Sequence, residues 1–147
     1  TDNTVIRVVF MIAIAIASLM RYYRISPQEK IKSMILRAVD DLIENCRTET
    51  GIFYYKELPS LQKPSGANAL EPLAIAYELT GDKKYIEAGV DQFKLWKSKN
   101  IPPLGIAKRI EGDSVINEGL GTKTFAQEFW PVLSYYKAAT EAGIDLS

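Results

Sequence analysis

Apolar residues recur at intervals of three and four positions in several parts of the chain. Between positions 31 and 42, apolar residues stand at 31, 34, 35, 38, 39 and 42, with mostly polar residues between them. This spacing places the apolar side chains on one face of an α-helix. The same pattern predicts five helices, at residues 5–23, 27–46, 67–80, 82–99 and 124–142.

The helical pattern repeats along the chain with an offset of 54 residues. Residues 23–31 align with residues 77–85, so that apolar positions match apolar ones, serine matches threonine and proline matches glycine. Each copy is preceded by one predicted helix and followed by another, which is the arrangement of a repeated helix–turn–helix unit. The sequence therefore predicts a single all-α domain over residues 1–147, built from antiparallel helical hairpins.

Residues typical of helix ends mark the predicted turns. Ser26 is suited to cap the helix at 27–46, with Pro27 at its first position. Gly81 is suited to end the third helix and Asp82 to cap the fourth, while Gly143 follows the last helix. Short turns of this kind join neighbouring antiparallel helices.

One proline lies inside a predicted helix. Pro131 falls within the segment 124–142. Proline removes a backbone donor and clashes with the preceding turn of a helix. We therefore expect either a kink at this position or a helix that begins near Phe129.

The connections between the predicted helices alternate between short and long. The long ones, after the second and the fourth helix, span about 20 and about 24 residues, which is long for a compact domain. Residues 51–58 read as a short strand, and residues 106–110 and 114–116 read as a β-hairpin. In an alternating hairpin array both long connections fall at one end of the helices, which is where we expect the functional site.

The apolar run at residues 8–20 is the segment that most suggests a membrane. It contains 13 residues between Arg7 and Arg21, whereas a helix that spans a bilayer needs about 20. No small-residue cleavage site follows it, and the chain starts without methionine, so a signal peptide is not indicated. We expect a buried helix in a larger protein of which this chain is a piece. The alternative is a protein tethered to a membrane by this segment.

Composition narrows the possible chemistry. The 18 basic residues equal the 18 acidic ones, and this balance argues against binding to nucleic acid or to a membrane surface. The chain has no histidine, so it cannot by itself assemble a Ser-His-Asp triad or a histidine-bound zinc site. Its single cysteine, Cys46, cannot form an internal disulfide. We therefore expect neither a metal nor a cofactor.

One acidic cluster looks like a metal-binding box. Asp40, Asp41 and Glu44 stand close together on the second predicted helix, and helical enzymes that act on diphosphates hold magnesium with such carboxylates. The segment lacks a second acidic partner elsewhere in the chain. A solvated helix face is the better interpretation.

The repeated unit resembles a known superfamily. Residues 74–88, preceded by Leu70 and Leu73, are similar to the helical hairpin of (α/α)6 toroids, as are the fainter copy at 20–35 and the segment 51–55. Such toroids occur in six-hairpin glycosidases, unsaturated-uronyl hydrolases and several polysaccharide lyases. The resemblance implies inner helices that line a barrel, outer helices that wrap it and long loops that form a sugar-binding mouth. About two and a half hairpins are present, so it implies a fragment or a carboxy-terminal arc.

The candidate site residues are those that fall on the expected mouth. Sugar cleavage usually needs two carboxyl groups, and a lyase needs a base such as tyrosine or lysine beside a neutralised uronate. No carboxylate pair stands at a diagnostic spacing. The weak catalytic candidates are Glu57, Glu71, Glu118 and Glu128, and the candidates for saccharide binding are Tyr54, Tyr55, Lys56, Asn68, Lys108, Arg109 and Trp130.

These observations lead to two functional hypotheses. The first is a carbohydrate-active domain, similar to a glycoside hydrolase or a polysaccharide lyase, that contributes part of a saccharide-binding mouth and is inactive alone. Its partner is an oligo- or polysaccharide, with self-association or missing toroid hairpins covering the open edges. The second is a non-catalytic hairpin domain that binds protein. An extracytoplasmic or periplasmic location is the weak expectation, and neither nucleic acid nor membrane is expected as a partner.

Overall fold

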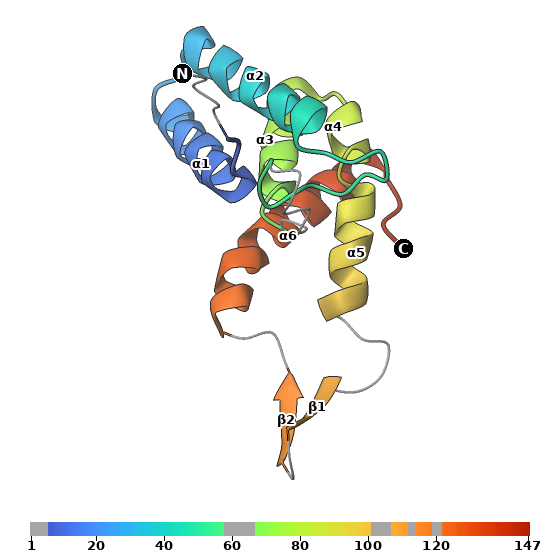
Figure 1. Ribbon diagram of the computed structural model, residues 1–147. Coiled ribbons are helices and arrows are strands. Elements are labelled where there is room, and N and C mark those ends of the chain that lie inside the picture. Colours follow the sequence, from blue (N-terminus) through green and yellow to red (C-terminus); the bar gives the residue numbers. More distant parts are fainter. Residues whose placement is uncertain (1–5, 58–66, 101–106, 112–113, 119–121) are drawn as a thin grey trace.

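The fold is built almost entirely from helices. The computed structural model describes residues 6–57, 67–100, 107–111, 114–118 and 122–147, with only the backbone described at 99–100, 107–111, 114–118 and 122–125. The predicted all-α class is confirmed. In chain order the elements are α1 (Val9–Ile25), α2 (Glu29–Asn45), α3 (Leu70–Thr80), α4 (Lys84–Glu87), α5 (Val90–Asn100), β1 (Ala107–Glu111), β2 (Ser114–Glu118) and α6 (Thr122–Ala142) (Figure 1).

The helix α3 occupies the centre of the molecule. It contacts α1, α2, α4 and α6, and it lies between α1 and α6 in Figure 1. In Figure 1, α1, α3 and α6 all run from the lower to the upper part of the view, and two side-chain contacts link them. Arg24 near the end of α1 pairs with Glu78 near the end of α3 at 2.8 Å, and Trp130 in α6 donates to Glu71 at the start of α3 at 2.9 Å. The chain thus forms a row of three parallel helices, each pair of neighbours joined through a returning helix.

The sequence separations of these two contacts can be compared with the offset of the sequence repeat. Arg24 and Glu78 are 54 residues apart, which is the offset of the repeat, and Glu71 and Trp130 are 59 residues apart. Parallel neighbouring helices at the same height place equivalent positions of successive repeats side by side. The repeat offset therefore predicts the contact between Arg24 and Glu78.

The helix α2 buries the face that its periodicity predicts. Ile35, Val39 and Leu42 are fully buried at successive turns of α2. Burial of each such side chain contributes about 1.5–3 kcal/mol to folding. The same core receives Phe53 from the segment after α2 and Ile16 from α1.

The helix α1 buries only one of its faces in this chain. Ala13, Ile16 and Met20 are buried, whereas Met11 is 59% exposed and Ile14 61% exposed. The expected burial on every side is therefore not met within the described residues. No helix in the described ranges is both long enough and apolar enough to cross a membrane.

The two glycines predicted to end helices do so, whereas the helix cap predicted at Ser26 is not formed. Gly81 and Gly143 both adopt the left-handed conformation, with φ of 71°, directly after α3 and α6. Asp82 lies one residue before Lys83, the N-cap of α4, and its carboxylate accepts the backbone N–H of Lys84 at 3.0 Å. The predicted cap at Ser26 is wrong, because α2 begins three residues later and Ser26 instead closes α1 by donating its N–H to Tyr22.

The proline in the last helix does not mark its start. The helix α6 begins at Thr122 and runs through Pro131 to Ala142, so the expected start near Phe129 is wrong. The missing N–H of Pro131 removes one hydrogen bond of the helix without ending it.

The predicted helix 82–99 is interrupted after its first turn. The carbonyl oxygen of Ile86 accepts the Tyr135 hydroxyl, and that of Ala88 accepts Nε of Arg47 at 2.9 Å. These side chains take acceptors that a continuous helix would use itself, and the chain turns at 88–89 between α4 and α5. Gly89 fills the turn because a Cβ there would lie 2.7 Å from both Leu73 Cδ1 and Tyr135 Cε2.

The long connections contain the extended segments that were predicted, in part. Residues 51–57 form single bridges instead of a strand, with Phe53 opposite Arg47 and Lys56 opposite Val8. The β-hairpin is confirmed in its backbone, with Ala107 opposite Glu118 and Glu111 opposite Ser114. Both long connections lead into the amino-terminal ends of parallel helices, α3 and α6 (Figure 1).

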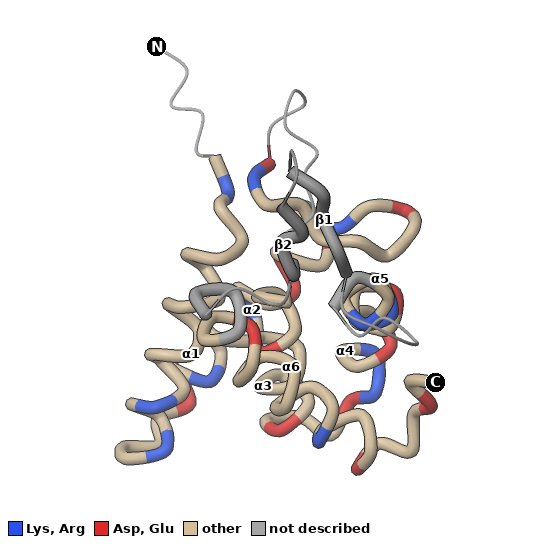
Figure 2. The backbone as a smooth tube through the Cα atoms, turned by 90° about the horizontal axis from the view of Figure 1, so that it is seen from below, with Lys and Arg blue, Asp and Glu red and all other residues tan. Residues whose placement is uncertain are grey.

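Charged positions of both signs are distributed over the helices (Figure 2). Two residues of the acidic cluster on α2 form contacts with neighbouring side chains. Asp40 accepts the Tyr85 hydroxyl at 3.0 Å, and Asp41 accepts Nε of Arg7 at 2.7 Å. Among the described residues no group of three or more Cys, Asp or Glu side chains could hold a metal ion.

The tight contact at Gly89 leads to a stability prediction. Gly89→Ala should lower the free energy of unfolding by about 1–3 kcal/mol, because the added methyl overlaps Leu73 and Tyr135. Urea unfolding followed by circular dichroism measures this change. Gly81→Ala is the control, since its methyl meets open space and its cost of about 1–2 kcal/mol comes from the left-handed backbone alone.

A double-mutant cycle separates the two causes. Leu73→Ala should relieve part of the overlap created by Gly89→Ala and so show a favourable coupling with it, whereas it should be additive with Gly81→Ala. Additivity in both cycles would contradict the packing role of Gly89.

Candidate functional site

The candidate site lies in a groove between α3 and α6. The groove has a volume of about 350 Å³ and receives the carboxy-terminal end of α1 at one side. We call it the α3–α6 groove. Its polar and aromatic lining residues are Arg24, Glu71, Tyr77, Glu78, Trp130, Ser134, Lys137 and Glu141.

Glu71 stands in the first turn of α3, where a carboxylate is favoured by the exposed N–H groups of the helix. Pro72 follows it in the same turn, where the lack of a backbone donor has no cost. The residues before α3 form a turn in which Leu70 donates its N–H to Ala67 at 3.0 Å. This local structure fixes the direction in which Glu71 leaves the helix.

Trp130 holds Glu71 from the neighbouring helix. Its indole Nε1 donates to Glu71 Oε1 at 2.9 Å, and the Trp130 side chain is 56% exposed. An indole held at its N–H end keeps its ring in one orientation while a face stays open to solvent. The sequence named both residues separately, and the structure brings them together.

The carboxyl group of Glu71 has a raised pKa. Burial is the main cause, because it disfavours the charged form; the hydrogen bond from Trp130 and the positive charges of Arg21 and Arg24 lower the pKa in part. Glu71 therefore keeps its proton to a higher pH than an ordinary glutamate. A carboxyl group with this property is suited to donate a proton.

A second carboxylate lies on the same helix face. Glu78 follows Glu71 by two turns, which is about 10 Å along the helix axis, and it forms an ion pair with Arg24 at 2.8 Å. Lys137 and Glu141 on α6 form another pair at 3.7 Å. Sequence reasoning missed Arg24, Glu78 and Lys137. The repeat offset could have found the first two, since they are equivalent positions of successive repeats.

The remaining carboxylate candidates do not join this groove. Glu57 accepts Nη1 of Arg7 at 2.8 Å beside the start of α1. Glu128 accepts Nε1 of Trp96 at 2.7 Å and lies against α5. Glu118 lies in β2, and its side chain is outside the described residues. Among the carboxylate candidates whose side chains the structure describes, Glu71 is thus the one that bonds to Trp130.

The predicted saccharide-binding residues divide into separate groups. Tyr55 stacks on Phe10 with ring centres 5.5 Å apart, and Lys56 lies over the Tyr55 ring at 5.7 Å. Tyr54 donates its backbone N–H to Cys46 at 2.9 Å, which holds this segment against the end of α2. These three residues pack beside the ends of α1 and α2 and do not line the α3–α6 groove.

The other predicted binding residues are not part of the described groove. Asn68 lies in the turn before α3, half-buried, and does not line it. Lys108 and Arg109 lie in β1, and their side chains are outside the described residues.

The lone cysteine is not placed for nucleophilic chemistry. Cys46 is fully buried after α2. Burial raises the pKa of its thiol to about 11, so the thiolate is scarce at neutral pH.

Comparisons with known proteins add no relative. A scan of protein-family models, a search of curated proteins and a search of solved structures each found no match to this chain.

The contact between Glu71 and Trp130 predicts a titration. The indole N–H resonance of Trp130 should shift with pH, with a midpoint above 4.5, the ordinary pKa of a glutamate, because the indole donates to the Glu71 carboxyl group. Two-dimensional NMR on the ¹⁵N-labelled chain measures it. Glu71→Gln should abolish the shift.

Glu71→Gln also tests how the protonation of Glu71 changes the stability of the folded chain. A pKa raised by folding means that the folded chain holds the proton more tightly, so stability falls as pH rises from the unfolded to the folded pKa. Glu71→Gln should lack this fall. A Trp130 midpoint at or below the ordinary glutamate value would contradict the assigned environment.

Proposed function

We propose that the α3–α6 groove binds a sugar ring of an oligo- or polysaccharide, and that the chain is part of a carbohydrate-active domain of the toroid type. The observation that carries this proposal is the exposed Trp130 ring fixed by the half-buried carboxyl group of Glu71. The groove lies on the row of parallel helices, α1, α3 and α6, which corresponds to the inner helices of the proposed toroid.

Trp130 supplies the apolar part of such a site. A sugar ring has a face of C–H groups that stacks on a broad aromatic surface, and an indole offers that surface together with a polar end. Because the Trp130 N–H is already bonded, its ring is held in place before a ligand arrives. Less conformational freedom is then lost on binding.

The carboxylates and cations supply the polar part. Glu71 Oε1 accepts one hydrogen bond from Trp130, and a carboxyl group has further capacity for sugar hydroxyls. Arg24 and Lys137 place donors along the same groove. The site therefore offers acceptors and donors on either side of one aromatic face, as hydroxyl-rich ligands require.

The raised pKa of Glu71 supports a role as proton donor in a cleavage reaction. Glycoside hydrolysis needs an acid with a raised pKa and a second carboxylate across the scissile bond. Glu78 is already neutralised by Arg24. We therefore assign saccharide binding and the acid to this chain and expect no turnover from the chain alone.

A second candidate function has its own observation. Met11, Ile14, Tyr22 and Ile25 form an exposed apolar stripe on α1, at the outer edge of the helix row. Exposed stripes of this kind mark surfaces that pack against other polypeptides. This favours a hairpin domain that binds protein, and it is the interpretation that remains if no saccharide binds.

The proposal predicts which residue saccharide binding needs. Trp130→Ala should weaken oligosaccharide binding at least about tenfold, because it removes the stacking face. Titration with neutral and uronate-containing oligosaccharides, followed by the backbone amides of residues 70–78 and 130–141, measures the affinity.

The matched control lies on the same helix. Tyr136→Ala removes an aromatic side chain that is 55% exposed, nearly as exposed as Trp130, but it does not line the α3–α6 groove. Its affinity for saccharide should stay unchanged. No saccharide-dependent shift in the wild-type chain, or equal losses in both variants, would overturn the proposal.

A further inference from the structure

Each described cation that lines the α3–α6 groove is already paired with a carboxylate of the same groove. Arg24 Nη2 lies 2.8 Å from Glu78 Oε2, and Lys137 Nζ lies 3.7 Å from Glu141 Oε1. No other lysine or arginine of the described residues lines the groove. A ligand carboxylate could therefore reach a cation there only by displacing one of these partners, and the displaced carboxylate would stay beside it.

Glu71 is the remaining charged group of the lining in the described part of the chain. Its carboxyl group accepts the neutral indole N–H of Trp130, and the cations whose charges act on it are Arg21 and Arg24 of α1. Arg21 is exposed and does not line the groove. When Glu71 is ionised, Arg21 and the two paired cations offset the three carboxylates, so the described charges in and beside the groove cancel.

The other polar groups of the groove are uncharged. Tyr77 and Ser134, which carry hydroxyl groups, also line it. A hydroxyl group both donates and accepts, and a carboxyl group has several acceptor positions. Sugar hydroxyls can therefore find partners here without adding or removing charge.

A uronate would be at a disadvantage in this groove. Its carboxylate would lie in the same groove as the half-buried carboxyl group of Glu71, and like charges brought together across an interface lower affinity. The Trp130 ring offers no compensation, because the face of an aromatic ring is the negative side of its quadrupole. An uncharged ring meets neither obstacle.

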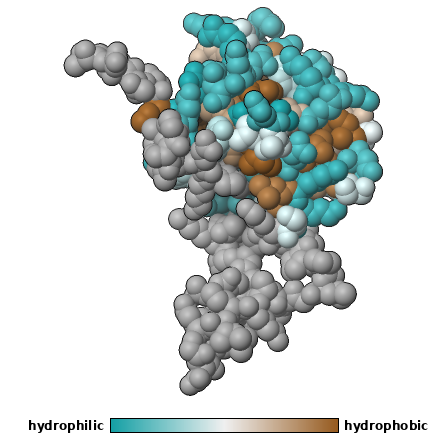
Figure 3. All heavy atoms as spheres, turned by 45° about the vertical axis from the view of Figure 1, so that its right-hand side comes forward, coloured by the Kyte–Doolittle hydropathy of each residue, from teal (hydrophilic) through white to brown (hydrophobic). Residues whose placement is uncertain are grey.

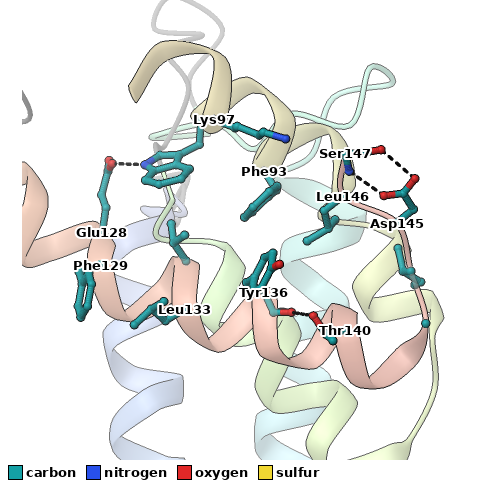
Figure 4. A pocket seen from close by; sticks show the side chains of 14 residues that line it. Phe93, Lys97, Glu128, Phe129, Leu133, Tyr136, Thr140, Asp145, Leu146 and Ser147 are labelled. Carbon is teal, nitrogen blue, oxygen red and sulfur yellow. Dashed lines mark hydrogen bonds between the residues drawn. The ribbon is translucent and has the colours of Figure 1, made fainter. Parts of the chain in front are cut away.

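The groove on the other side of α6 shows that an indole bonded to a glutamate is not enough for such a site. There Trp96 donates to Glu128 at 2.7 Å, as Trp130 does to Glu71 at 2.9 Å. This α5–α6 groove has a volume of about 870 Å³ and a mostly apolar lining (Figure 4). Figure 3, which brings the α5 side of the molecule forward, shows hydrophobic surface between hydrophilic segments on this side. Paired charges and hydroxyl groups therefore distinguish the α3–α6 groove, and the indole contact does not.

We propose that the α3–α6 groove selects an uncharged sugar ring and discriminates against a uronate. The inference rests on the proposed saccharide binding and names the class of sugar that binds. The face of the ring stacks on Trp130, its hydroxyl groups bond to Glu71 and the neighbouring hydroxyl groups, and Arg24 stays paired with Glu78.

Matched oligosaccharides that differ only in charge test the proposal. The probes are the tetramers of α-1,4-linked galacturonate and of β-1,4-linked glucuronate, each compared with its own methyl ester. Calorimetry at low ionic strength, at a pH above the midpoint of the Trp130 resonance, measures the affinities. We expect the ester of at least one pair to bind, and to bind at least about fivefold more tightly than its acid. Added salt should reduce this preference, because it screens charges that are partly exposed.

A charge-neutralising variant tests whether the ion pair sets the preference. Glu78→Gln removes the partner of Arg24 and should reduce the preference for the ester at least about threefold, because a uronate then finds an unpaired cation. The matched control is Glu128→Gln, which changes the charge of the chain by the same amount in the α5–α6 groove and should leave the preference unaltered. The Glu78 side chain is 53% exposed, so the fold should persist, and circular dichroism checks both variants.

The possible outcomes separate this inference from the proposal on which it rests. If neither ester nor acid of either pair binds, saccharide binding itself is overturned, and the inference with it. If the wild-type chain binds an acid as tightly as its ester, or more tightly, saccharide binding stands and the selection of an uncharged ring is overturned. A preference that Glu78→Gln leaves unaltered, or that both variants reduce equally, also overturns the inference, because the ion pair in the groove is then not its cause.

Discussion

The buried turn at Gly89 positions the rest of the molecule. Three elements meet there without space for a side chain, since Leu73 of α3 and Tyr135 of α6 both approach to where a Cβ would stand. Tyr135 is fully buried and bonds its hydroxyl to the carbonyl of Ile86, which ties α6 to the break between α4 and α5. Burial raises the pKa of this phenol strongly, so it remains a neutral hydrogen-bond donor. Because this contact fixes α6 against both α3 and α5, it sets the two grooves that flank α6.

Most helices could be predicted from the sequence because their signals are local. The apolar stripe of α2 and the glycines after α3 and α6 act within one or two turns of their own position. The break in the predicted helix 82–99 could not be predicted in the same way. It depends on Arg47 and Tyr135, which lie 41 and 49 residues away from the carbonyl groups that they bind. Long-range hydrogen bonds of this kind leave no mark in local periodicity.

The candidate site was predicted in parts but not as an arrangement. Glu71 and Trp130 were each named because they fall on the expected mouth, and the contact between them follows from the packing of α3 on α6. The 54-residue separation of Arg24 and Glu78 matches the offset of the repeat, whereas Glu71 and Trp130 are 59 residues apart. The repeat offset, used to predict contacts, would therefore have paired Arg24 with Glu78 but not Glu71 with Trp130. It would not have given the raised pKa of Glu71, which results from burial in the folded chain.

The two sides of α6 present different kinds of surface. On the α3 side the exposed groups are charged or can form hydrogen bonds, and the aromatic surface is a single indole held by a carboxyl group. On the α5 side several aromatic and aliphatic groups share one larger hollow. Removing water from a hydroxyl-rich ligand costs little free energy only where hydrogen-bond partners on the protein take the place of that water. For an apolar helix face, the removal of water over a broad area is itself favourable. Leu133 lines both grooves, so the same helix separates a groove with many charged and polar groups from one that is mostly apolar.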